Sequence, residues 1–148
     1  MRQICYFFVI GLPATQGSKQ FVTRYYARDS CKRLPAWRKN VGTCARQWYK
    51  GDPLLCPIYL DLEFMLPRPK SHCRTGMYSD VLKDTAPARH IVKPDLIKMA
   101  RAVEDAMSGI VYKDDSQVFD YVGLKKRYAD IGEDVGVNVT VLVEDIDI

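Results

Sequence analysis

Two adjacent aspartates, Asp114 and Asp115, stand at the start of a run rich in valine, phenylalanine and tyrosine, VYKDDSQVFDYV. Neighbouring carboxylates repel each other. They are tolerated in a turn, where water screens them, or at a site where a cation supplies the missing positive charge. A third aspartate, Asp95, opens a predicted helix shortly before this run. If that helix packs back on the sheet, these carboxylates converge and offer the oxygen ligands that Mg²⁺ prefers.

Basic residues flank these acidic positions, and four of them are candidates for holding a phosphate: Lys93, Lys98, Arg101 and Lys113. A divalent cation beside a phosphodiester polarises it and activates a water for in-line attack. Nearby cationic side chains stabilise the charge of the transition state. The pattern therefore suits phosphodiester chemistry, but the spacing alone leaves the simpler interpretation open, since an aspartate pair in a turn is more often only a turn.

Charge is distributed unevenly along the chain, whose formal net charge is +4. The first 50 residues hold ten bases and one acid, and residues 66–93 hold six bases and two acids. After Tyr128 there are six acids and no base. A basic part beside a separate acidic cluster indicates a polyanionic partner together with a cation site. The alternative is a solvated surface with uneven charge.

Length and composition describe an ordinary globular chain of 148 residues, which we expect to form a single domain over residues 1–148. The apolar start of the chain favours a first strand over a signal peptide. No apolar run approaches the roughly 18 residues of a membrane span. The five cysteines are odd in number and irregular in spacing, which excludes a disulfide framework and a CxxC zinc site. Reduced thiols favour a cytoplasmic location.

The hydrophobic periodicity predicts an α+β fold: a mixed sheet of four to five strands with two main helices on one face. The predicted strands are 3–12, 57–66, 116–128 and 137–145, with a further strand possible at 21–27, and the predicted helices are 34–51 and 93–109. We place Pro94 in the first turn of the second helix and Gly109 just past its end. The last two strands are expected to pair antiparallel. Between them and the first half lies a long basic segment, 67–92, of the kind that is usually functional or mobile.

The stretch KPDLIKMARAVEDAMSGIVYKDDSQV, followed by LKKRY, resembles the RusA family of Holliday junction resolvases. The family pattern is a helix opening with D-x-D, a basic residue about one turn on, then D-A-L-x-G, then D-D-x-Q-V entering a strand. Asp95 matches the first aspartate, Arg101 matches the basic position, and residues 105–109 match D-A-L-x-G. Asp114, Asp115, Gln117 and Val118 match D-D-x-Q-V. The resemblance covers most of the chain and is specific over residues 93–128.

The resemblance implies a RusA-like fold and a small homodimeric endonuclease that binds four-way DNA junctions, requires Mg²⁺ and nicks symmetrically placed strands in recombination and repair. It implies catalytic roles for Asp95, Asp115, Arg101 and Lys113, and metal binding by Asp95, Asp114 and Asp115. The residues expected to bind DNA are Lys19, Arg68, Lys70, Lys93, Lys98, Lys125 and Lys126.

One position departs from the family pattern, since Ile97 stands where the second helical aspartate is expected. Glu104 returns to nearly the same helical face, but seven residues place it roughly 10 Å further along the axis, too far to substitute at the same point. Either the site uses a rearranged set of carboxylates, or the protein binds junctions and cuts them poorly. A general DNA-binding regulator, indicated only by the basic half, is the third alternative.

Overall fold

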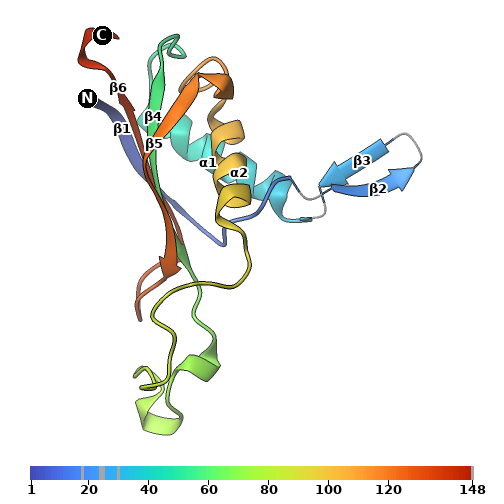
Figure 1. Ribbon diagram of the computed structural model, residues 1–148, viewed down its shortest axis with the longest axis vertical. Coiled ribbons are helices and arrows are strands. Elements are labelled where there is room, and N and C mark those ends of the chain that lie inside the picture. The colour runs from blue at the N-terminus through green and yellow to red at the C-terminus, as the bar shows by residue number, and fades with distance from the viewer. Residues whose placement is uncertain (18, 24–25, 30, 148) are drawn as a thin grey trace.

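The computed structural model describes residues 1–17, 19–23, 26–29 and 31–147, with only the backbone described at 19–22, 26–29 and 147. This part of the chain forms a four-stranded mixed sheet, a separate two-stranded hairpin and two α-helices, α1 and α2 (Figure 1). Both helices lie on the same side of the sheet (Figure 1). The predicted α+β class, with a sheet of four to five strands and two main helices, is confirmed.

The sheet is built around β4 (Ile58–Leu66), in the order β1-β6-β4-β5. β6 (Gly136–Val143) lies antiparallel between β1 (Arg2–Ile10) and β4, whereas β5 (Val118–Tyr128) runs parallel to β4 on its other side. The predicted antiparallel pairing of the last two strands is therefore wrong. The parallel pairing of β4 with β5 requires a crossover, which α2 provides, and β6 then crosses to the far side of β4.

Alternation in β4 sorts its side chains between two environments. Ile58, Leu60, Leu62 and Phe64 face the helices and are fully buried. The intervening Asp61 and Glu63 lie on the other face and remain partly exposed. β4 is central because its apolar face can be covered by both helices while strands flank it on both edges.

The first helix, α1 (Leu34–Trp48), begins with Pro35 in its first turn and buries Trp37, Val41 and Ala45 along one stripe. Trp37 belongs to the core, whereas Trp48, the last residue of the helix, is 60% exposed.

The second helix, α2 (Leu96–Met107), begins three residues later than the start predicted at residue 93. Asp95 has an extended backbone and occupies the N-cap, so Pro94 precedes the helix and does not belong to its first turn. The far end agrees with the prediction: Gly109 follows the C-cap with a φ of +84°, a conformation that glycine adopts without strain. Met99, Ala100, Val103 and Met107 belong to the buried stripe that anchors α2 on the sheet.

Two segments project from this body (Figure 1). The predicted single strand at 21–27 is an antiparallel hairpin of β2 (Lys19–Thr23) and β3 (Tyr26–Asp29). The segment between β4 and α2 extends away from the sheet and contains two short 3₁₀ turns, η1 (Lys70–His72) and η2 (Gly76–Tyr78). The long predicted loop is thus an extended arm, and no described helix has the length and apolar character needed to cross a bilayer.

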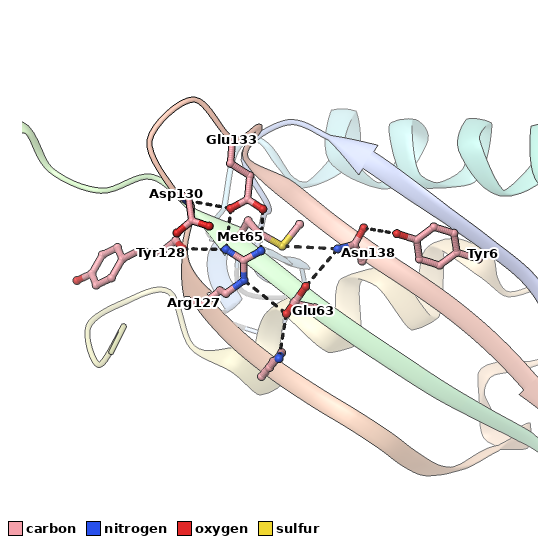
Figure 2. Close-up of polar contacts among 9 residues, drawn as sticks. Tyr6, Glu63, Met65, Arg127, Tyr128, Asp130, Glu133 and Asn138 are labelled. Atoms are coloured by element: carbon pink, nitrogen blue, oxygen red, sulfur yellow. Dashed lines mark hydrogen bonds and ion pairs between the residues drawn. The ribbon is translucent and has the colours of Figure 1, made fainter. Parts of the chain in front are cut away.

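The sheet face opposite the helices carries a polar network (Figure 2). Glu63 on β4 forms ion pairs with Lys125, at 3.0 Å, and with Arg127, at 3.4 Å. Arg127 also donates two hydrogen bonds, of 2.6 and 2.7 Å, to Glu133 in the loop before β6. The Arg127 guanidinium holds the pKa of Glu133 at about 2. These pairs connect β4, β5 and the loop that leads to β6. A last 3₁₀ turn, η4 (Asp145–Asp147), follows β6.

Candidate active site

The aspartate pair lies at η3 (Asp115–Gln117), the turn between α2 and β5. Asp114 is its N-cap. The Asp114 carboxylate accepts hydrogen bonds from the Ser116 hydroxyl and from the Ser116 backbone N–H, the latter at 3.1 Å. The Asp114 N–H in return donates to Gln117 Oε1 at 2.8 Å. The Ser116 hydroxyl and N–H lower the pKa of Asp114. Asp114 therefore has a structural role of its own, as the capping residue of the turn.

Gln117 fixes this turn to the chain that enters β4. Its side-chain amide donates to the carbonyls of Leu54 and Cys56, both at 2.9 Å. Lys113 adds a backbone hydrogen bond of 3.1 Å from its N–H to the Leu54 carbonyl, while its side chain is exposed. The turn that carries Asp115 is thus held on both sides.

Asp115 is half-buried and its charge acts on Glu104 of α2. Burial raises the pKa of the Glu104 carboxyl, and the charges of Asp115 and Asp105 raise it further, against the opposing effects of Tyr121 and Arg101. The Tyr121 hydroxyl lies beside Glu104, although among the described residues it completes no hydrogen bond of standard geometry. The acidic group at this position therefore carries more negative charge than its surroundings compensate.

Tyr112, between α2 and the aspartate pair, contacts the backbone of Glu104. Its side chain is fully buried, and its hydroxyl donates a hydrogen bond of 2.6 Å to the backbone carbonyl of Glu104. Burial, followed by the charge of Glu104, raises the pKa of Tyr112. The phenol therefore stays neutral and remains a hydrogen-bond donor. This bond ties the connection after α2 to the helix turn that carries Glu104.

Arg101 lies one turn before Glu104, packed against the loop that follows β1. A Cβ atom on Gly17 would lie 2.5 Å from Arg101 Nη1, and Gly17 has a φ of +117°. Only glycine suits this position, because any side chain would displace the guanidinium and strain the backbone. The loop is held on α2 by a 3.0 Å hydrogen bond from the Gln16 N–H to the Lys98 carbonyl. The charge of Arg101 lowers the pKa of Glu104, against the effect of burial.

Asp105, next to Glu104, has a positioning role. Its carboxylate accepts the Arg38 guanidinium of α1 at 2.5 Å and the Gln16 side-chain amide at 3.2 Å. One side chain of α2 thus joins the first helix and the loop after β1.

Asp95 lies at the opposite end of α2 from Glu104. Its carboxylate is 3.7 Å from Lys98 Nζ, one turn on. Nine residues separate Asp95 from Glu104, which corresponds to about 13 Å along the helix axis. Ile97, between them in sequence, is 60% exposed. No group of three or more histidine, cysteine or acidic side chains with metal-binding geometry occurs within the described ranges.

The predicted DNA-binding residues occupy different settings. The Arg68 guanidinium carbon lies 4.2 Å from the Tyr128 ring centroid, and Arg68 donates to the Pro87 carbonyl at 2.7 Å. These contacts connect the start of the arm to its later part and to the end of β5. Lys126 donates to the carbonyls of Val92 and Pro94, at 2.7 and 2.8 Å. Lys125 pairs with Glu63, Lys98 with Asp95, and Lys70 and Lys93 are exposed on the arm. The side chain of Lys19 lies outside the described residues.

The sequence profile described as Endodeoxyribonuclease RusA matches residues 12–141 of this chain. The chain belongs to the RusA family. It is also 29% identical over 117 residues, 77% of this chain and 81% of the relative, to the uncharacterized protein YqaN of Bacillus subtilis (strain 168). The match spans α2, which carries Arg101 and Glu104, η3, which carries Asp115, and β5, which carries Tyr121.

The sequence did not predict Glu104 and Tyr121 as members of this candidate site. Glu104 was judged by its distance from Ile97, whereas its relevant neighbour is Asp115 on the following turn. The register of β5 against β4 is irregular near Tyr121, so a simple alternation in the sequence does not place this side chain beside α2. The donor set, two carboxylates whose charge Arg101 compensates only in part, suits a hard divalent cation.

Proposed function

We propose that this RusA-family protein is a Mg²⁺-dependent endodeoxyribonuclease that nicks four-way DNA junctions. The observation that carries the proposal is the half-buried Glu104, whose pKa is raised by burial and by the charge of Asp115, with Arg101 acting in the opposite direction. A buried carboxylate that is not fully compensated is stabilised when a divalent cation binds. Mg²⁺ requires only one or two protein carboxylates, since water and substrate phosphate complete its coordination.

Asp115 and Glu104 are the side chains proposed to hold the ion. Asp95 and Asp114 remain candidate ligands from the family resemblance, with Lys98 and Ser116 as their present partners. A bound Mg²⁺ supplies Lewis acidity at the scissile phosphate. Arg101 and Lys113 are proposed to neutralise that phosphate, because both side chains are exposed. Arg101 lies one turn before Glu104 on α2, and Lys113 lies shortly before Asp115 in the sequence.

The substrate proposal rests on charge and shape. The arm between β4 and α2 carries six bases in residues 66–93, and both projecting segments extend beyond the compact body (Figure 1). Basic projections supply phosphate contacts that are independent of sequence. A homodimer would present two such sites, one for each of two opposed strands of a junction.

The direct test of function is a comparison of DNA substrates. Wild-type protein is incubated with a synthetic four-way junction and with a linear duplex of the same sequence, with Mg²⁺ or with EDTA. We expect paired nicks in the junction with Mg²⁺, none with EDTA, and much slower cutting of the duplex. Equal cutting of junction and duplex would contradict the junction preference. Cutting that persists in EDTA would contradict the metal requirement.

A second candidate function is a junction-binding protein with weakened cutting. It is favoured by Ile97, an exposed apolar side chain where the family pattern has an aspartate. Tight binding of the junction without nicks, in either Mg²⁺ or Mn²⁺, would support it. Equal affinity for junction and duplex at matched salt would instead indicate a general DNA-binding protein.

A further inference from the structure

A cavity of about 370 Å³ lies where the arm leaves the sheet, next to the start of α2. Its walls come from the ends of β4 and β5, the loop after β1, and the last residues of the arm. The lining includes Leu12, Leu66, His90, Val92, Pro94 and Tyr128. This size falls within the range of about 300–1,000 Å³ that is typical of small-ligand pockets.

His90 supplies the cavity with an unused polar group. The residue is 8% exposed, and its Nδ1 atom has no hydrogen-bond partner within the described part of the chain. Burial, and then the charge of Lys126, lowers the pKa of His90. A buried polar atom without a partner is unfavourable and rare in folded proteins. A ligand that offers a hydrogen-bonding edge would satisfy it.

Aromatic rings form one wall of the cavity. The rings of His90 and Tyr128 lie with their centroids 4.7 Å apart and their planes tilted by 49°. The guanidinium of Arg68 holds the Tyr128 ring in place. Aromatic side chains are the surfaces on which single-stranded nucleic acids place their bases.

Two cations lie at the rim. Arg33 and Lys93 both line the cavity. Arg33 is fixed by hydrogen bonds of 2.8 and 3.3 Å to the carbonyls of Leu12 and Pro13, whereas Lys93 is exposed. An apolar interior, one internal hydrogen-bonding group and positive charge at the entrance together match a nucleotide, with its base inside and its phosphate outside.

We propose that this cavity accepts one unstacked base of the junction strand, beside the start of α2. The inference rests on the proposed function and deepens it by assigning a base-binding site. The cavity borders the start of α2, because Pro94 lines it and directly precedes Asp95, the N-cap of this helix. Lys126 holds the carbonyls of Val92 and Pro94, so the cavity wall and the start of α2 are fixed together. Extrusion of a base is least costly where pairing is already disturbed, as at a junction crossover.

Junctions containing 2-aminopurine at single positions around the crossover test this proposal. Protein is added without Mg²⁺, binding is measured by fluorescence anisotropy of a terminal label, and 2-aminopurine emission is recorded at each position. We expect at least a twofold change of emission at one position on each of two opposed strands, and little change elsewhere. Junction binding in which no position responds would overturn the cavity assignment and leave the proposed function intact. Absence of junction binding by the wild-type protein would overturn both.

Two neighbouring substitutions provide a matched pair. Val92→Trp enlarges a side chain that lines the cavity and is 59% exposed, whereas Ile91→Trp places the same ring at a residue that is 85% exposed and does not line it. The expected result is loss of the localised emission change in Val92→Trp and its retention in Ile91→Trp, with junction binding retained in both. His90→Phe keeps an aromatic ring but removes Nδ1, and it should weaken the change. An identical response in wild type and Val92→Trp would show that the base lies elsewhere.

Discussion

The Tyr112 hydroxyl is bonded to the backbone carbonyl of Glu104 at 2.6 Å, deep in the core. This bond joins the chain that carries the aspartate pair to the helix turn that carries the opposing glutamate. Tyr112→Phe removes it without changing the packed ring. We expect the free energy of unfolding to fall by about 1 kcal/mol, the usual net value of such a bond. Urea unfolding measures it, with the exposed Tyr78→Phe as control; equal losses in the two variants would contradict a structural role for the bond.

Glu104→Gln tests whether the half-buried charge of Glu104 destabilises the folded protein when no metal is bound. The folded-state pKa of Glu104 is raised above its ordinary value of 4.5, so its stabilising contribution is complete below that value and is lost as pH rises through the folded pKa. At neutral pH without metal, we therefore expect Glu104→Gln to be more stable than wild type, with a difference that grows from pH 4.5 upward. Thermal unfolding in EDTA across this range measures it, and a difference that shrinks with rising pH would contradict the prediction.

The same variant tests metal binding without reference to activity. Mg²⁺ stabilises whichever state binds it. We expect Mg²⁺ to raise the melting temperature of wild type and to have a clearly smaller effect on Glu104→Gln. Glu63→Gln, on the opposite face of the sheet, should respond to Mg²⁺ like wild type. The same comparison with Asp95→Asn shows whether Asp95 or Glu104 acts with Asp115.

Ile97→Asp tests the departure from the family pattern. Ile97 is 60% exposed, so its replacement should change stability by no more than about 0.5 kcal/mol. If the missing aspartate limits cutting, Ile97→Asp should increase the rate of junction nicking by about tenfold or more in Mg²⁺. Stability is checked by urea unfolding and the rate by single-turnover nicking. A rate equal to that of wild type would indicate that the rearranged carboxylates are sufficient.

Much of the fold could be predicted, because helices and strands depend on patterns among residues that are close together in the sequence. The alternation of residues 57–66 predicted strand β4, and the apolar stripe and Gly109 located α2 and its end. Local patterns did not reveal that β5 and β6 are unpaired. Nothing in the residues of these two strands shows that β4 lies between them in the sheet.

The candidate site was predicted in part for the same reason. The motif identified Asp115 and Arg101, whose neighbours are set by helix and turn. It assigned Asp114 to the metal, although Asp114 is also the N-cap of η3, a role set by the conformation of that turn. Glu104 joins the site only through the packing of η3 against α2. Its raised pKa comes first from burial, which no spacing in the sequence reveals.

Asp115→Asn tests the central claim most directly. Single-turnover nicking of a four-way junction in Mg²⁺ is measured for wild type, Asp115→Asn and Asp120→Asn, an exposed control on β5, and junction affinity is measured in EDTA. Removing one carboxylate charge at the ion should slow nicking by at least about 100-fold, equivalent to about 2.7 kcal/mol, with affinity and the Asp120→Asn rate close to wild type. Nicking by Asp115→Asn at the wild-type rate would contradict the account and remove Asp115 from the chemistry.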